Sequence, residues 1–215
     1  MRIDTKTVSV STAITMKTTR SYTMTSRAEA AEQTRLRILE ATAELGRTRL
    51  LPDISLDDVA RAAGVSVQTV LRRFGNRAGL VAAAFDQVSS AIIEERRAPV
   101  GDVRAAVHVI VDHYELRGDG VVMMLAQEHA EESIRFVVGR GRELHRAWVE
   151  EIFAPLLPAR AAERTALVDL LVVATDVYTW KQLRRDRGLD RATTEERMLR
   201  LVAALLSPDP PPSTP

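Results

Sequence analysis

Apolar side chains recur at three- and four-residue intervals along most of the chain, which is the spacing of amphipathic helices. The first three patterns cover residues 29–46, 55–64 and 67–74, and a fourth covers about 77–97. No segment shows the strict alternation of a half-buried strand. The pattern therefore predicts an all-α protein.

Beyond Pro99 the same spacing predicts about five helices over residues 100–206, which we expect to pack as a bundle. Glycine, proline and polar clusters predict where these helices end. The expected breaks lie at 118–120, near 128–132, at 155–158 and at 188–192. Two long helices, about 161–186 and 193–206, are expected to close the chain.

The two ends of the chain lack helical periodicity. Residues 1–25 are rich in threonine and serine, and residues 208–215 are rich in proline, so we expect a disordered arm and a disordered tail. Between them the pattern predicts a head at 26–76, a connecting helix at 77–97 and a bundle at 98–207. No apolar stretch is long enough for a membrane span, and we expect a cytoplasmic protein with no membrane partner.

Composition adds one informative feature. The chain of 215 residues has a net charge of +1 and no cysteine, which excludes disulfides and thiolate metal sites. Yet no acidic residue lies between Asp58 and Asp86, while four arginines do. A basic stretch of this kind suits a polyanion, although charge alone also fits a solvated helix face.

Residues 55–75 have the pattern of a helix-turn-helix. Ser55 and Asp58 form a predicted capping box that opens the first short helix. Gly64 ends that helix with a left-handed backbone, and Ser66 caps the second helix. Between them, Val65 places an apolar side chain where the two helices meet. An ordinary helical hairpin is the alternative, but capping, turn, spacing and the depletion of acids all favour a DNA-reading element.

In a helix-turn-helix the second helix lies in the major groove, which assigns roles to its residues. Serine and threonine hydroxyls near its start suit phosphates, glutamine suits an adenine edge, and valine suits a thymine methyl group. Arginines suit phosphates or guanine, and one at the start of the next helix can clamp a phosphate. The predicted DNA-contacting residues are Ser55, Ser66, Val67, Gln68, Thr69, Arg72, Arg73 and Arg77.

Residues 30–85 resemble the tetracycline-repressor (TetR) family of transcriptional regulators. The resemblance rests on the Ile38–Ala41 segment, the run Ser55–Ser66, the segment Thr69–Phe74, and Asn76-Arg77 with Leu80. It implies a three-helix DNA-binding head and an all-helical body for ligand binding and dimerisation. It also implies that Val70 and Phe74 are core residues.

The chain departs from the family pattern at three positions of this segment. Leu71 stands where the family usually has a tyrosine that contacts the DNA backbone, and a leucine side chain cannot make that hydrogen bond. Arg73 stands where histidine or tyrosine is common, and Arg77 where lysine is common. Both arginines keep or add positive charge.

Both the resemblance and the symmetry of DNA operators predict a dimer. In the family the last two helices pair with their copies in a four-helix bundle. One small head reads few bases, whereas a two-fold dimer reads both halves of a palindromic operator on double-stranded DNA. Packing of both helices within one chain is the alternative.

The body offers candidate contacts for an unidentified small-molecule effector. The candidate ligand-binding residues are Met123, Phe136, Trp148, Asp176 and Trp180. Aromatic and methionine side chains at helical spacing also fit a plain core. Asp176 lies in an apolar run, where a lone carboxylate is costly, and it can meet a ligand or pair with an arginine of the bundle.

Catalytic and metal motifs are missing from the sequence. The four histidines are scattered, none forms a HExxH pair, and no glycine-rich phosphate loop follows a strand. We therefore expect no cofactor, no metal and no enzymatic activity. The sequence predicts a sequence-specific DNA-binding regulator, a ligand-responsive repressor acting as a homodimer. The alternative is a helical protein-interaction or structural bundle that binds no DNA.

Overall fold

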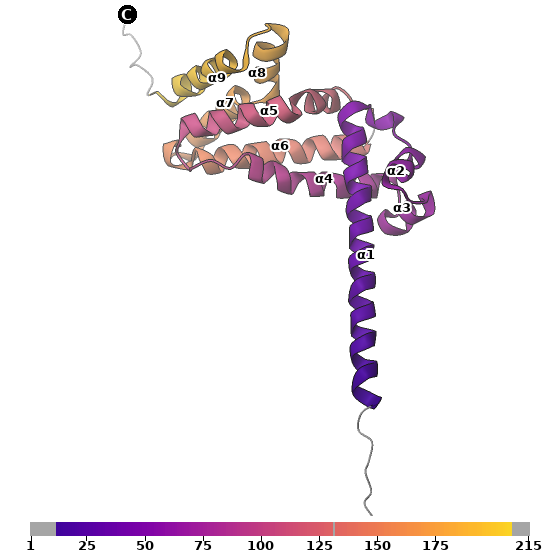
Figure 1. Ribbon diagram of the computed structural model, residues 1–215. Helices are drawn as coiled ribbons and strands as arrows, with labels where there is room; N and C mark the ends of the chain where they lie inside the picture. The colour runs from indigo at the N-terminus through magenta and orange to yellow at the C-terminus, as the bar shows by residue number, and fades with distance from the viewer. Residues whose placement is uncertain (1–11, 131, 208–215) are drawn as a thin grey trace, which may run out of the picture.

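A long helix, α1 (Thr12–Thr48), leads into two short helices, α2 (Leu56–Ala63) and α3 (Val67–Phe74), and the three together form the head of the molecule (Figure 1). The 3-10 turn η1 (Leu51–Asp53) joins α1 to α2. The computed structural model describes residues 12–130 and 132–207. The arm residues 1–11 and the tail residues 208–215 lie outside this description.

The remaining helices form the body. They are α4 (Arg77–Glu95), α5 (Val103–Leu125), α6 (Glu132–Ile152), the turn η2 (Ala154–Leu156), α7 (Ala161–Ala174), α8 (Val177–Lys181), the π-helical turn η3 (Gln182–Asp186) and α9 (Arg191–Leu206). Figure 1 shows α4, α5 and α6 running alongside one another, with α7, α8 and α9 beyond α5. Helix α5 packs on α8 and α9, and α6 packs on α4 and α7. The described residues contain no strand, which confirms the all-α prediction.

Two apolar clusters hold the molecule together. The head cluster contains Ile38 and Leu39 of α1 with residues of α2, α3 and α4. The body cluster gathers residues of α5 to α9, with Trp180 fully buried in it. Helix α6 belongs to both clusters, because Ile134 and Val138 lie in the head cluster while its C-terminal turns lie in the body cluster.

The arm differs from our expectation. We predicted no regular structure for residues 1–25, but α1 already begins at Thr12. The prediction is therefore wrong for residues 12–25. Threonine is a weak helix former, yet no glycine or proline interrupts the chain between Thr12 and Leu45. Extending an existing helix costs much less than nucleating one, so α1 continues through the threonine-rich segment.

The expected break at 118–120 is also wrong, because α5 runs unbroken from Val103 to Leu125. Gly118 serves close packing instead of a turn. A Cβ atom added there would lie 2.5 Å from Cζ3 of Trp180, so the missing side chain lets the indole lie against α5. The glycine inside α5 thus allows close contact with α8, which is distant in sequence.

The predicted helix over 161–186 is interrupted at Thr175 and Asp176. The Thr175 hydroxyl donates to the Leu171 carbonyl oxygen at 2.7 Å, and α7 ends there. The Asp176 side chain then accepts a hydrogen bond from the Tyr178 amide at 2.8 Å and caps α8. Short polar side chains compete for backbone groups in this way, which ends one helix and starts the next.

None of the helices in the described ranges combines the length and the hydropathy that crossing a bilayer requires.

Candidate nucleic-acid interface

A capping box fixes the start of α2. The Ser55 hydroxyl oxygen accepts from the Asp58 amide at 3.1 Å, and the Asp58 carboxylate accepts from the Ser55 amide at 3.0 Å. Hydrogen bonds from Ser55 lower the pKa of Asp58 to about 2. Arg49 and Arg61 also lie within 3.5 Å and 3.2 Å of this carboxylate. The capping box predicted from the sequence is confirmed, and it occupies the Ser55 side chain.

The turn between α2 and α3 has the predicted left-handed glycine. Gly64 has φ 65° and ψ 39°, a conformation that glycine adopts without steric cost. The Val65 amide donates to the Ala60 carbonyl at 2.9 Å, and the Gly64 amide donates to the Arg61 carbonyl at 3.3 Å. This pair of bonds is the Schellman motif, which sets the angle at which the chain leaves α2.

Helix α3 begins at a serine cap. The Ser66 hydroxyl oxygen accepts from the Thr69 amide at 3.2 Å and lies 2.9 Å from the Thr69 hydroxyl. Val70 is buried in the head cluster, and Phe74 and Val67 pack against that cluster from the same side of the helix. The opposite side of α3 therefore faces outward.

The outward face of α3 carries Gln68 and Arg72, whose side chains are exposed four residues apart. Arg72 forms no ion pair with any described residue, so its charge is available on this surface. Ser66 is exposed at the N-terminal end of the same helix, and Thr69 is half-buried beside it. Four of the predicted DNA contacts therefore belong to α3 and its cap, with Gln68 and Arg72 on the outward face and Ser66 and Thr69 at the N-terminal end.

The other predicted contacts lie in different surroundings. Val67 is half-buried and packs on the head cluster, so much of its side chain stabilises the fold. Arg73 is half-buried beside the core face of α3, and its Nε atom has no hydrogen-bond partner among the described residues. Ser55 is exposed but lies at the start of α2 and is held by the capping box.

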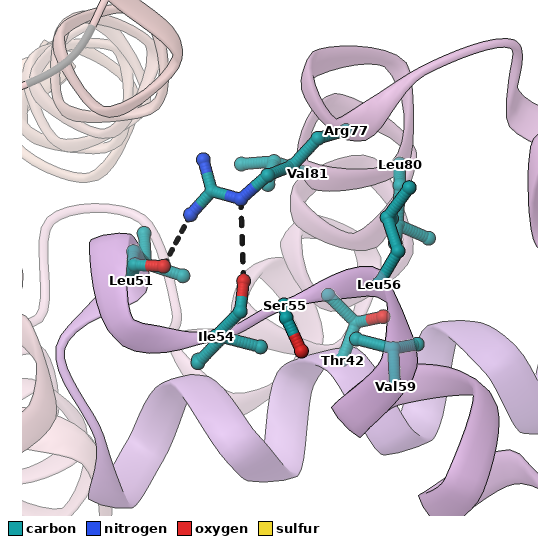
Figure 2. Close-up of a pocket in the computed structure, with 9 residues that line it drawn as sticks. All are labelled: Thr42, Leu51, Ile54, Ser55, Leu56, Val59, Arg77, Leu80 and Val81. Atoms are coloured by element: carbon teal, nitrogen blue, oxygen red, sulfur yellow. Dashed lines mark hydrogen bonds between the residues drawn. The ribbon is translucent and has the colours of Figure 1, made fainter. Parts of the chain in front are cut away.

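Arg77 turns inward to the loop before α2. Its Nε donates to the Ile54 carbonyl at 3.3 Å, and its Nη2 donates to the Leu51 carbonyl (Figure 2). The guanidinium therefore ties the start of α4 to η1, which is a different role from the predicted phosphate clamp. The adjacent cavity of about 10 Å³ holds roughly one water molecule and is too small for an effector.

Comparison with known proteins identifies this head. A family model described as "Bacterial regulatory proteins, tetR family" matches residues 38–84, which include the whole helix-turn-helix. This segment is similar to the TetR family. The resemblance inferred from the sequence is thereby confirmed.

Solved structures extend the likeness to the body of the TetR-type fold. A TetR-family transcriptional regulator from Streptomyces coelicolor superposes with a TM-score of 0.65 at 20% identity, over 81% of this chain and 80% of that one. A putative TetR-family regulator from Rhodococcus sp. gives 0.62 at 20% identity, over 81% and 100%. NalD of Pseudomonas aeruginosa, a secondary repressor of the MexAB-OprM multidrug efflux pump, gives 0.52 at 22% identity, over 82% and 96%. No curated protein sequence gives a significant match.

Within the head, Leu71 lies beside the outward face of α3. It is half-buried and lies outside the head cluster. The exposed Gln68 is its neighbour on the helix surface, because residues three apart lie side by side. The departure from the family pattern therefore places an apolar side chain beside Gln68.

In the body of this TetR-type fold, the predicted ligand residues lie in different surroundings. Trp148 and Trp180 are core residues whose indole N–H groups donate to the Arg96 carbonyl at 2.8 Å and to the Glu115 carboxylate at 2.9 Å. Phe136 is 53% exposed on α6. Met123 is half-buried near the end of α5, and Asp176 is occupied as the cap of α8. Their ligand-binding role remains a prediction.

We expect acid to destabilise the folded body, because two histidines are buried there. Burial lowers the pKa of His113 to about 3 and that of His145 to about 4, from an ordinary value of 6.5. The unfolded chain binds these protons near pH 6.5 and the folded chain only near pH 3 to 4, so stability should fall as pH drops through that window. We expect the melting temperature to decline below pH 6.5 and His145→Gln to flatten this decline.

Thermal denaturation across this pH range measures the effect. His129→Gln is the matched control for replacing a histidine, because His129 is exposed and lies outside the body cluster. A wild-type and a His145→Gln profile with the same slope between pH 6.5 and about pH 4 would contradict the prediction.

Proposed function

We propose that the protein is a DNA-binding transcriptional repressor, which acts as a homodimer on a palindromic operator and is released by a small-molecule effector. One observation carries the DNA-binding part of the proposal, namely the polar, acid-free face that Gln68 and Arg72 form on α3. Access to the operator requires the protein to act in the cytoplasm. A helical interaction or structural bundle remains the competing function.

The contacts divide into base reading and phosphate binding. Gln68 suits an adenine edge and Arg72 a guanine edge, because each side chain can make two hydrogen bonds in the major groove. Ser66 and Thr69 lie at the start of α3, where hydroxyls and backbone amides suit a phosphate. Arg73 adds positive charge beside them. Phosphate contacts fix the position of the helix, and base contacts provide sequence preference.

Exposed apolar side chains on two packed helices support the dimer. Leu170 is 51% exposed and Val173 is 65% exposed on α7, three residues apart and therefore on one face. Leu201 is 47% exposed on α9, which packs against α7. A second copy of the chain would bury these side chains in a bundle of two helices from each protomer. The two heads would then face two half-sites of one operator.

Repression and release follow from the arrangement of head and body. NalD, which shares the fold, is a repressor, and this supports the same sign of regulation here. An effector that favours a body arrangement with wrongly spaced heads would lower operator affinity by shifting the population of the dimer. A ligand that binds equally to the DNA-competent and DNA-incompetent forms would produce no release, and finding only such ligands would contradict this part of the proposal.

The function is tested by selecting DNA. Purified full-length protein is mixed with fragmented DNA from its source genome, and the retained fragments are sequenced across a salt series. We expect enrichment of a palindromic site, with affinity that falls steeply as salt rises. If folded protein enriches no site, also after denaturation and refolding to remove a bound ligand, the regulator proposal is wrong and the interaction-bundle function replaces it.

The dimer is tested by placing charge on the α7 face. We expect Leu170→Asp combined with Val173→Asp to give a monomer, because two carboxylates cannot be buried in an apolar interface without a large cost. Analytical ultracentrifugation measures the mass, and the operator-binding assay should show at least a ~10-fold loss of affinity, about 1.4 kcal/mol. Leu156→Asp is the matched control, since Leu156 is 41% exposed in η2 and should not affect the mass. A double variant that stays dimeric would exclude this interface.

A further inference from the structure

The body contains a buried arginine that has no acidic partner among the described residues. Arg96 follows the last residue of α4 and is only 9% exposed, and its Nε atom has no hydrogen-bond partner among the described residues. No carboxylate of the described ranges lies within ion-pair distance of its guanidinium. Its guanidinium lies over the ring of Tyr114, with the ring centroid 5.8 Å away. A buried cation without a counter-ion is costly and needs an explanation.

The carboxylates nearest to Arg96 have other partners. Glu95 accepts hydrogen bonds from Arg117 at 2.8 Å and lies 3.0 Å from His113. Asp176 accepts from the Tyr178 amide and caps α8. Both acids act on Arg96 only through their longer-range field, which favours its charged form. Neither is oriented to neutralise it.

Two histidines near Arg96 each present an unpaired acceptor. His145 places Nε2 within 3.2 Å of the Thr175 hydroxyl oxygen and 3.3 Å of the Val172 carbonyl, so its proton resides on Nε2. His113 uses Nδ1 for its contact with Glu95. The atoms His145 Nδ1 and His113 Nε2 are therefore buried acceptors with no partner in the described chain. The positive charge of Arg96 helps keep both rings neutral, since it lowers the pKa of each.

Apolar and aromatic groups surround these polar atoms. Trp148 stacks on His145 with ring centroids 5.8 Å apart, and its indole N–H donates to the Arg96 carbonyl. Tyr114 lies beneath the guanidinium, and its hydroxyl donates to the Thr175 carbonyl at 3.0 Å. The surroundings thus combine a fixed cation, free hydrogen-bond acceptors and aromatic walls. Small-molecule sites have this composition, with a few polar groups placed in a mostly apolar lining.

We propose that Arg96 is the anchor of an interior site that binds a small molecule with one carboxylate on an apolar body. A guanidinium holds a carboxylate through two parallel hydrogen bonds, and these are strongest in surroundings that exclude water. His145 Nδ1 and His113 Nε2 can each accept a hydrogen bond from a hydroxyl or amide group elsewhere on the same molecule. The apolar part of the ligand packs against Tyr114 and Trp148.

Naming this ligand an effector rests on the proposed function. Since Arg96 is buried, the carboxylate enters through local opening of the body and then stabilises the arrangement that holds it. Arg96 directly follows α4, the helix that also carries Ala84 in the head cluster. Movement of Arg96 toward a ligand would therefore act on a helix that reaches the head.

Thermal denaturation of the full-length protein with matched probes tests the site. The probes are octanoate, dodecanoate, benzoate and 2-naphthoate, each compared with its primary amide. We expect at least one carboxylate to raise the melting temperature by several degrees at saturation, as ligands that bind only the folded state do. The amide of the same body should give a much smaller shift. No shift with any carboxylate, or equal shifts with acid and amide, would overturn the proposal.

Replacing the arginine separates a binding role from a structural one. Arg96→Met and Arg96→Gln should each raise the dissociation constant of the carboxylate at least ~10-fold, the scale of a lost hydrogen bond to a charged group. Without ligand, both variants should melt at or above the wild-type temperature, because a buried unpaired charge has been removed. Arg104→Gln, on an exposed position of α5, should keep the full ligand shift. Arg96 variants that melt well below wild type, or that keep the carboxylate shift, would overturn the assignment.

The ligand test and the DNA test can fail separately. The melting shift needs no DNA, so a carboxylate shift that depends on Arg96 would stand even if genomic selection enriched no site. If both succeed, adding the carboxylate to the protein–operator complex should lower operator affinity. A carboxylate that binds through Arg96 and leaves operator affinity unchanged would contradict its role as an effector.

Discussion

Gly118→Ala should destabilise the protein by about 1–3 kcal/mol, the range measured when extra carbon is forced into a packed core. The added methyl group would lie 2.5 Å from Cζ3 and 2.7 Å from Cη2 of Trp180, far inside van der Waals contact. Trp180 is fully buried and is held by its hydrogen bond to Glu115 and by Arg185, 4.5 Å from its ring. The indole therefore cannot yield without disturbing the core around it.

Thermal denaturation and tryptophan fluorescence measure this effect. Trp180 is one of two tryptophans, so its displacement should also change the emission of the folded protein. Gly139→Ala is the matched control, because Gly139 lies inside α6 with nothing within 4 Å of an added Cβ. That variant should be more stable by roughly 0.5–1 kcal/mol, since alanine favours a helix over glycine. Equal effects of the two substitutions would contradict the packing role of Gly118.

Arg72→Ala should weaken binding to the selected operator by roughly 1–3 kcal/mol, or about 5- to 150-fold. Arg72 is exposed on the outward face of α3 and has no ion pair with the described residues, so its removal should leave the melting temperature unchanged. Affinity is measured on the operator and on a scrambled duplex over a salt series. A larger loss on the operator than on the scrambled duplex would assign Arg72 to base reading.

An equal loss on both duplexes with a smaller salt slope would instead assign Arg72 to a phosphate. Arg97→Ala is the control, because Arg97 is exposed beyond α4 and pairs with Glu94, so its loss removes the same charge away from α3. Unchanged affinity of the Arg72→Ala variant on every duplex would exclude α3 as the DNA-reading helix.

The head could be predicted from sequence because local groups determine it. The Ser55–Asp58 box, the left-handed Gly64 and the Ser66 cap each satisfy backbone atoms within a few residues. Such devices are visible in the sequence whatever surrounds them. Arg77 was harder to interpret, because its carbonyl partners lie 23 and 26 residues earlier.

The body was harder to predict because contacts between distant segments determine it. Gly118 resembles a turn residue until Trp180 is found against it, 62 positions later in the chain. Trp148 and Trp180, two of the candidate ligand-binding residues, lie in the body core, and the polar partners of their indoles are remote in sequence. Nothing in the local sequence of Arg96 reveals that α5 and α6 cover it. An arginine at a helix end ordinarily indicates a surface cation.

Because α6 contributes to both apolar clusters, the head and the body are not independent folding units. Ile134 and Val138 are separated from Trp148 by ten residues or more, so one rigid helix spans about 15–20 Å between the two cores. A head excised at the end of α4 would lose two buried side chains and expose their sites to water. Transplanting this DNA-reading unit onto another body would therefore require the first turns of α6 to travel with it, although they follow the head by more than fifty residues.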